Sequence, residues 1–298
     1  MKQTVSGVLL LLFGFAMCRA FAEEPRAIGL SVEPGGLLIQ NVPVGQLYDM
    51  DYWMKMRFKI ANDSGMPRKY ALRVDKPSRV GVKLLKGYTE IPNPDWFWFE
   101  KNEVFVAAGG TAEVKMFLRI PNEDKYANQR WAVAVDVEAR PEAEEKLVLA
   151  LSPVFYIETE AKATPKELPA GFTALVPGTV VVDHVAIGKR TDGGSATLYN
   201  NDSQPHLYTV TSVVPSAEPG RQTISPSPRS SWLPNVGWVK VDKRTIKLGP
   251  RERRDLHLRI DVPKDPRWQN QDWETLLYVE SEDGLASFAR IQIKTHAR

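Results

Sequence analysis

The sequence predicts an all-β protein built from two tandem sandwiches of similar size. Three observations predict this fold class: an internal repeat, hydrophobic alternation with a period of two, and turn residues between the alternating stretches. The repeat is clearest in residues 96–131 and 238–273, which share Trp, apolar and Ile-Pro or Val-Pro positions at a gapless offset of 142 residues. Two copies of one structural unit explain this most simply.

Two further blocks recur in the same order. Residues 34–45 correspond to residues 177–188, and both begin with Pro-Gly. The next block matches Asn62, Pro67, Tyr70 and Leu72 with Asn200, Pro205, Tyr208 and Val210. The offset changes only between blocks, so only loops differ in length between the two copies.

Alternating side chains identify the strands. Four apolar residues, Val114, Met116, Leu118 and Ile120, alternate with polar or exposed positions, as half-buried strands require. Met54, Met56, Phe58 and Ile60 are expected to form another such strand face. Turn residues such as Asn62–Gly65 and Gly249-Pro250 separate these stretches. About seven short strands per unit predict two immunoglobulin-like β-sandwiches.

The expected organisation is a signal peptide over residues 1–22, a first sandwich over 23–160, a linker over 161–171 and a second sandwich over 172–298. Lys2, the apolar stretch Val8–Met17 and the small-x-small site Ala20–Ala22 predict cleavage after Ala22. A lipoprotein signal acylated at Cys18 is the alternative, but Met17 stands where a small residue is usual. In the linker, Pro and Lys replace the strand pattern.

These features predict an exported protein, periplasmic or secreted. Cleavage removes Cys18, the only cysteine, so the mature chain forms no internal disulfide, which fits a bacterial envelope protein better than a secreted eukaryotic one. The formal net charge of +3 is small and indicates no nucleic-acid partner. No later apolar run is long enough to predict a transmembrane segment in the mature chain. The choice between periplasm and cell surface stays open.

The run of Trp, strand, Gly-containing turn and alternating strand ending in Ile-Pro or Val-Pro resembles bacterial immunoglobulin-like modules of cell-envelope proteins. Asn62 before a polar turn, and the strands expected over 131–137 and 146–157, resemble more weakly the first domain of periplasmic pilus chaperones. That family carries a basic pair on its first and last strands. Here residues 30–41 and 147–151 contain no basic residue, and Arg26 and Lys146 only border them.

The sequence predicts no catalytic residue, no metal site and no cofactor. Its four histidines, His184, His206, His257 and His296, are too scattered for ligand spacing. Asp49-Met50-Asp51 is read as a polar loop rather than a calcium site. There is no Gly-x-Ser-x-Gly elbow and no mature cysteine nucleophile. A paired-carboxylate glycosidase remains an alternative, because such pairs meet only in the fold, although the short loops disfavour it.

The repeat separates core aromatics from candidate binding residues. Matched positions, Trp96/Trp238, Trp131/Trp273, Tyr70/Tyr208 and Tyr126/Trp268, are assigned to the two cores. Trp98 is unmatched because the corresponding residue in the second copy is Lys240. Trp53 corresponds to Thr191, and Trp232 lies in a loop without counterpart. We expect these three tryptophans at an interface, where indoles are favoured. The alternative is that Trp53 or Trp98 packs against the neighbouring sandwich.

The second unit carries a cluster of basic residues. Lys240, Arg251, Arg253 and Arg254, with Arg259, could form a strip that binds an anionic polymer or headgroup; the alternative is a solvated surface. The function that fits these features best is a non-catalytic exported protein-binding or scaffold protein of the bacterial envelope, binding another envelope protein partly through edge-strand pairing. The alternatives are a chaperone-like protein for pilus subunits and a carbohydrate-binding module that stacks sugars on Trp98 or Trp53.

Overall fold

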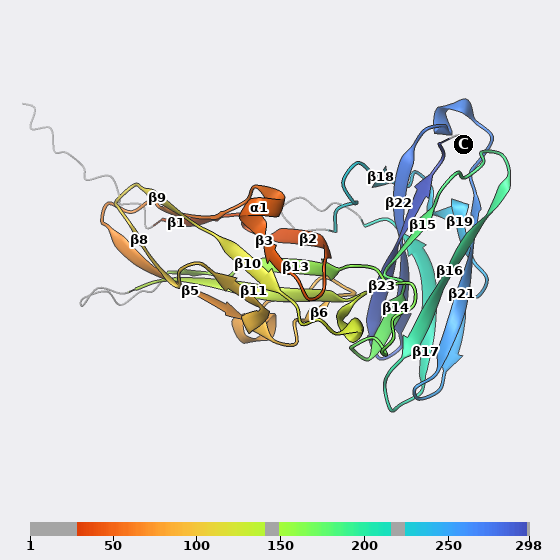
Figure 1. The fold of residues 1–298 in the computed structure, drawn as a ribbon, viewed down its shortest axis with the longest axis horizontal. Coiled ribbons are helices and arrows are strands. Elements are labelled where there is room, and N and C mark those ends of the chain that lie inside the picture. Colours follow the sequence, from red (N-terminus) through yellow and green to blue (C-terminus); the bar gives the residue numbers. More distant parts are fainter. Residues whose placement is uncertain (1–28, 141–148, 216–223, 297–298) are drawn as a thin grey trace, which may run out of the picture.

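The computed structural model describes residues 29–140, 149–215 and 224–296 (Figure 1). The expected signal peptide, its cleavage after Ala22 and residues 146–148 lie outside the described residues. Figure 1 shows two β bodies, one drawn along the horizontal and one upright, which meet at the end of the first. Strand pairings join β1–β13 into one set and β14–β23 into another, and within the described ranges none joins the two sets. We call these sets the first and second sandwich.

Within the described ranges, the first sandwich contains thirteen strands, several of only two or three residues, one short α-helix and three short 3₁₀ helices. Its elements are β1 (Leu30–Glu33), β2 (Leu37–Val42), β3 (Leu47–Asp49), α1 (Met50–Met54), β4 (Phe58–Asn62), β5 (Arg68–Asp75), β6 (Thr89–Glu90), β7 (Phe97–Phe99), β8 (Glu103–Val106), β9 (Thr111–Val114), β10 (Met116–Arg119), β11 (Arg130–Ala139), β12 (Ala150–Leu151) and β13 (Val154–Thr159). Sheet β2-β13-β11-β5-β8, with β6 and β12 also on β11, faces sheets β1-β4-β9 and β3-β10-β7.

In the part of the second sandwich that the structure describes there are ten strands. They are β14 (Thr173–Val176), β15 (Thr179–Val182), β16 (Arg190–Asn200), β17 (His206–Val213), β18 (Ser231–Trp232), β19 (Val239–Val241), β20 (Thr245–Leu248), β21 (Arg253–Asp261), β22 (Asp272–Ser281) and β23 (Ala286–Lys294). Its sheet β15-β23-β22-β17-β20 has the same order as β2-β13-β11-β5-β8, and β15 runs parallel to β23 as β2 does to β13. The all-β fold of two immunoglobulin-like sandwiches is confirmed.

The repeated asparagines hold equivalent turns. Asn62 is fully buried, and its amide donates to the carbonyls of Met66 at 2.7 Å and Ala107 at 3.1 Å. Asn200 is also fully buried, and its amide donates to the carbonyls of Gln204 and Gly249, both at 2.8 Å. Each side chain satisfies backbone groups that would otherwise be buried without partners. The match between Asn62 and Asn200 therefore reflects a turn structure that the two copies share.

The repeated aromatics form one three-ring cluster in each sandwich. Centroids of Trp96, Tyr126 and Trp131 lie 4.9–5.8 Å apart, and those of Trp238, Trp268 and Trp273 lie 5.3–5.6 Å apart. Trp131, Trp238 and Trp273 are buried, as expected. Trp96 is only partly buried, because it lies in the 3₁₀ turn Pro94–Trp96 ahead of β7 and covers Trp131 from the rim.

Two local expectations were wrong. Residues 53–60 do not form one strand: the Asp49 carboxylate accepts from the backbone N–H groups of Asp51 and Tyr52, caps helix α1, and Lys55 ends the helix at φ 53°. Trp53 therefore lies on a helix. The strand expected to end at residue 157 is divided into β12 and β13 at Ser152-Pro153, where proline has no N–H to donate.

We predict that Trp131→Ala and Trp273→Ala each lower the free energy of unfolding by about 3–5 kcal/mol, because each leaves a cavity in a closed ring cluster. Chemical denaturation measures this loss. Trp53→Ala is the matched control, since its indole is 57% exposed. Losses below about 1 kcal/mol for the two core variants would show that the repeated tryptophans are not core residues.

Candidate functional site

Trp98 faces outward from an edge strand, as expected. On β7 its neighbours Phe97 and Phe99 are 1% and 4% exposed, whereas Trp98 is 36% exposed. Its ring stacks on Phe117 of β10, with centroids 5.6 Å apart and planes 23° apart. Because β7 ends sheet β3-β10-β7, the indole face turned away from Phe117 is at the sheet edge.

Trp53 lies at the other side of the same small sheet. Helix α1 follows directly after β3, and Trp53 stacks on Tyr48 of β3 at 6.1 Å and meets Tyr52 edge-on at 5.1 Å. Tyr52 and Trp53 are both exposed. Trp53 and Trp98 are thus exposed rather than packed against the second sandwich, and they flank one sheet without contacting each other.

Trp232 has a different environment. It pairs with Glu274 across β18 and β22, and it is partly buried against an apolar cluster that both sandwiches share. The buried members of this interdomain cluster are Tyr88, Ala132, Val154, Tyr156, Ile224, Leu276 and Phe288. The structure therefore places Trp232 at the junction between the sandwiches.

The basic residues of the second sandwich share their surface with acids. Along β21, Arg253, His257 and Arg259 alternate with outward Asp255 and Asp261. Lys240 pairs with Asp261 at 2.9 Å. Arg253 lies 5.9 Å from the ring of Tyr199, Arg254 stands opposite Leu198 on β16, and Arg251 lies in the turn before β21. The geometry gives a mixed-charge face rather than a uniformly positive strip.

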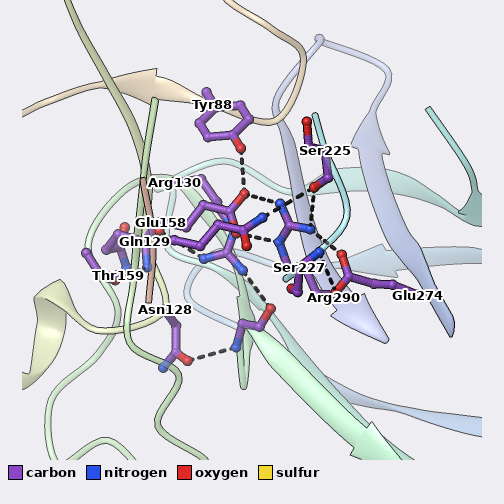
Figure 2. Close-up of polar contacts among 12 residues, drawn as sticks. Tyr88, Asn128, Gln129, Arg130, Glu158, Thr159, Ser225, Ser227, Glu274 and Arg290 are labelled. Atoms are coloured by element: carbon purple, nitrogen blue, oxygen red, sulfur yellow. Dashed lines mark hydrogen bonds and ion pairs between the residues drawn. The ribbon is translucent and has the colours of Figure 1, made fainter. Parts of the chain in front are cut away.

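A buried ionic network joins the two sandwiches (Figure 2). Arg290 of β23 reaches Glu158 of β13 with two bonds, Nε to Oε2 at 2.5 Å and Nη2 to Oε1 at 2.6 Å. Its Nη1 donates to Glu274 of β22 and, at 3.0 Å, to the carbonyl of Ser225. The Tyr88 hydroxyl donates to Glu158 Oε1 at 2.6 Å. A bidentate Arg–carboxylate pair of this kind fixes orientation as well as distance.

Arg130 links the network to the start of the second sandwich. It lies opposite Glu158 in the β11–β13 ladder, with Nε 3.6 Å from Glu158 Oε2. Its Nη2 donates to the carbonyl of Gly178 at 2.6 Å, while the Gly178 N–H donates to Asn128 Oδ1 at 2.8 Å. A Cβ at Gly178 would lie 2.9 Å from Arg130 Nη2, so a larger residue would displace the guanidinium from this position.

The four charges balance within a nearly dry environment. Arg130, Glu158, Glu274 and Arg290 are at most 6% exposed. Burial alone would raise the pKa of Glu158, but the charges of Arg130 and Arg290 outweigh it and hold that pKa below its ordinary value. Burial lowers the pKa of Arg290, and Glu158 and Glu274 more than offset this and raise it.

The Glu158 carboxylate also keeps Tyr88 protonated. Burial and the charge of Glu158 raise the pKa of Tyr88 well above its ordinary value, so the phenol stays protonated and donates. Every buried charge in the network therefore has a partner, and the arrangement holds the sandwiches together.

A cavity of about 360 Å³ opens beside this network. It is lined by four segments: residues 83–89 and 128–130 of the first sandwich, residues 170–174 at the end of the linker and the start of the second sandwich, and residues 284–287 of the β22–β23 hairpin. At its mouth Lys86 bonds Glu280 at 2.5 Å and lies 5.3 Å from the ring of Tyr278. Within the described part of the chain, no group of three or more His, Cys, Asp or Glu is placed to hold a metal ion.

Strand β12 presents an open sheet edge. The N–H groups of Ala139 and Val135 donate to the carbonyls of Leu149 and Pro153, both at 2.9 Å. By the alternation of an antiparallel ladder, the N–H and C=O of Ala150 point away from β11. On the side of β12 that faces away from β11, no described strand pairs with it. Strand β2 pairs with β13 on that side, but this pairing begins only at Leu37 and Phe155, beyond the end of β12. Ala150 and Leu151 are exposed.

Sequence reasoning missed the ionic network, although a signal was present. Glu158 follows directly after the run 154–157, and Arg290 lies within 288–293, where Gln292 is the only other polar residue. The ladders pair Trp131 with Ile157 and Trp273 with Ile293, which places Arg290 at the position that Val154 takes in the first copy. A comparison of charged positions between the two copies would have identified Arg290 as a residue without a charged counterpart.

Comparisons with known proteins show only a general likeness. No family model and no curated protein matches the chain. A Porphyromonas gingivalis protein of unknown function is 16% identical, with TM-score 0.33, over 90% of this chain and 99% of that one. The Escherichia coli chaperone DraB is 11% identical, with TM-score 0.31, over 89% and 97%. A Salmonella enterica structure of SafA pilin with the SafB chaperone is 11% identical, with TM-score 0.32, over 89% of this chain and 96% of that one. These values assign no function.

No helix within the described ranges is both long enough and apolar enough to cross a bilayer.

We predict that Arg290→Leu lowers the free energy of unfolding by about 3–5 kcal/mol, because it leaves Glu274 buried without its cation and Glu158 with only the longer contact to Arg130. The matched control is Lys86→Ala, which removes an exposed ion pair between the same two sandwiches and costs about 1 kcal/mol or less. Denaturant unfolding of both variants compares them directly. Equal losses would contradict a dominant role for the buried network.

Proposed function

We propose that this chain is a non-catalytic exported protein that binds an extended segment of another envelope protein along strand β12. The open edge of β12 carries the proposal, since the outward backbone groups of Ala150 can pair with an added strand. Strand addition of this kind takes its affinity from main-chain hydrogen bonds and its specificity from alternate side chains.

The surroundings of β12 indicate which segment fits. Leu30 and Val32 of β1, and Leu149 just before β12, are partly buried residues that pack on the core of the first sandwich. β1 lies beside β12 without pairing to it. An added strand would place every second side chain towards these residues. The proposed partner segment therefore alternates apolar and polar residues.

A chaperone for surface-fibre subunits is the more specific form of this proposal. An alternating apolar strand is compatible with it, and the SafB structure is described as a complex of a chaperone with a pilin. Against it, residues 30–41 and 149–159 contain no Lys or Arg to anchor a terminal carboxylate. We therefore propose partner binding through the strand edge and not through such an anchor.

We predict that Ala150→Pro weakens partner capture about tenfold or more, near 1.4 kcal/mol, because it removes an outward N–H. The ladder bonds to β11 come from Leu149, Leu151 and Pro153, so unfolding stability should change little. The measurement is photo-crosslinking from position 151 of the mature protein in its own envelope, with and without Ala150→Pro, and with position 103 on β8 as control. Absence of crosslinks at 151, equal yields at positions 151 and 103, or an unchanged yield in Ala150→Pro would contradict the proposal.

We predict that Trp98→Ala reduces capture of the same partner while costing far less stability than Trp131→Ala, because Trp98 is the exposed member of its strand. Pulldown yield and denaturation midpoint should be measured on one preparation. Loss of glycan binding with unchanged protein capture would instead favour the carbohydrate-binding alternative. A stability loss equal to that of Trp131→Ala would place Trp98 in the core.

A further inference from the structure

His206 is a buried histidine held between two carboxylates. It begins β17, is 7% exposed, and contacts Asp202 Oδ2 through Nε2 at 2.9 Å and Asp283 Oδ2 through Nδ1 at 2.8 Å. A neutral imidazole has one donor and one acceptor nitrogen, whereas the imidazolium donates from both. Only the protonated ring satisfies both contacts, because a neutral ring would direct a lone pair at one carboxylate.

The two carboxylates come from different segments of the second sandwich. Asp202 lies in the turn between β16 and β17, and Asp283 in the hairpin between β22 and β23. The hairpin continues into Gly284–Ser287, which line the cavity between the sandwiches. The imidazolium therefore joins the β16–β17 turn to one wall of that cavity.

The same turn also holds the linker. The Asn201 amide donates to the carbonyls of Pro169 at 2.7 Å and Gly171 at 3.1 Å, and its backbone N–H donates to Phe172 O at 2.8 Å. Asp202 is thus adjacent in sequence to Asn201, the residue whose contacts fix residues 169–172.

The charged groups around His206 favour its protonated form. Other charged residues on the elements packed against it are engaged elsewhere or point to solvent: Glu280 bonds Lys86, Glu252 accepts from the Gly249 N–H, and Glu282, Lys247 and Arg251 are exposed. Tyr208 meets the ring edge-on at 5.9 Å, and its hydroxyl bonds Thr173 Oγ1. The two aspartates are therefore the charged groups in contact with the ring.

We propose that His206 is a pH-dependent clamp: when protonated it fixes the β22–β23 hairpin and the linker turn together, and when neutral it releases the hairpin. Release occurs at Asp283, whose side chain is 69% exposed and can turn to water. Asp202 is 23% exposed and is also held by the N–H of Ser203 at 2.6 Å. The neutral protein thus keeps the turn but loosens one wall of the cavity.

The direction of the pH dependence follows from the contacts. Burial lowers the pKa of His206, but the hydrogen bonds and charges of Asp202 and Asp283 outweigh it, so the folded-state pKa lies above its ordinary value. A raised folded pKa means that the stabilisation is complete below the unfolded value of about 6.5 and is lost as pH rises through the folded value. The clamp is closed in acid and opens towards alkaline pH.

The test uses the full mature chain and two measurements. Imidazole ¹⁵N chemical shifts give the titration midpoint of His206. Hydrogen exchange of the hairpin amides Ser281 and Leu285, which bond Leu285 O and Ser281 Oγ, reports release of the hairpin. We expect the His206 midpoint above about 6.5, the ordinary value of an imidazole. We also expect a loss of hairpin protection of about tenfold beyond intrinsic base catalysis, which would equal about 1.4 kcal/mol.

Asp283→Asn is the deciding variant, because it keeps the fold and removes one carboxylate. It should lower the His206 midpoint and leave hairpin protection independent of pH. A midpoint for His206 at or below about 6.5 would overturn the proposal. So would pH-independent protection in the unmodified protein, or an unchanged pH dependence in Asp283→Asn.

Discussion

The arrangement of this molecule depends on one buried ion pair, Arg290 with Glu158. Each sandwich has its own apolar core, and a short linker alone would let the two rotate against each other. Removing two charges from water is offset only when the geometry is satisfied, so a bidentate pair with few alternatives selects one orientation. Tyr88, Arg130 and Glu274 complete that geometry, and the interdomain apolar cluster excludes water around it.

The two copies of the unit differ at a few positions that depart from the repeat. Buried asparagines, ring clusters and strand order are common to both and maintain the sandwich. Where Val154 stands in the first copy, the second has Arg290, and this one change supplies the cation of the junction. Gly178 matches Gly35 in sequence, but only Gly178 is approached by an arginine from the other sandwich. The edge at β12 and the indole of Trp98 belong to the first copy.

Local patterns account for much of the fold. Period-two alternation and the gapless repeat predict both sandwiches, and the inward Phe97 and Phe99 with outward Trp98 follow from the same alternation. Helix α1 was missed because a single cap, Asp49, overrides an apolar alternation that a strand would also explain. The break before β13 was readable at Pro153. The pairing of Glu158 with Arg290, and of His206 with Asp283, could not be predicted from the sequence, because these residues meet only through tertiary packing.

The most direct test of this account is the distance distribution between spin labels on the two sandwiches. Exposed Lys69 of β5 and Lys247 of β20 can be replaced by cysteine in a chain whose single native cysteine, Cys18, is replaced by serine. Pulsed electron–electron double resonance should give one narrow distance distribution for this protein and a broad one for the Arg290→Leu variant. A distribution that is broad in both proteins, or narrow in both, would contradict the claim that the buried pair sets the orientation of the sandwiches.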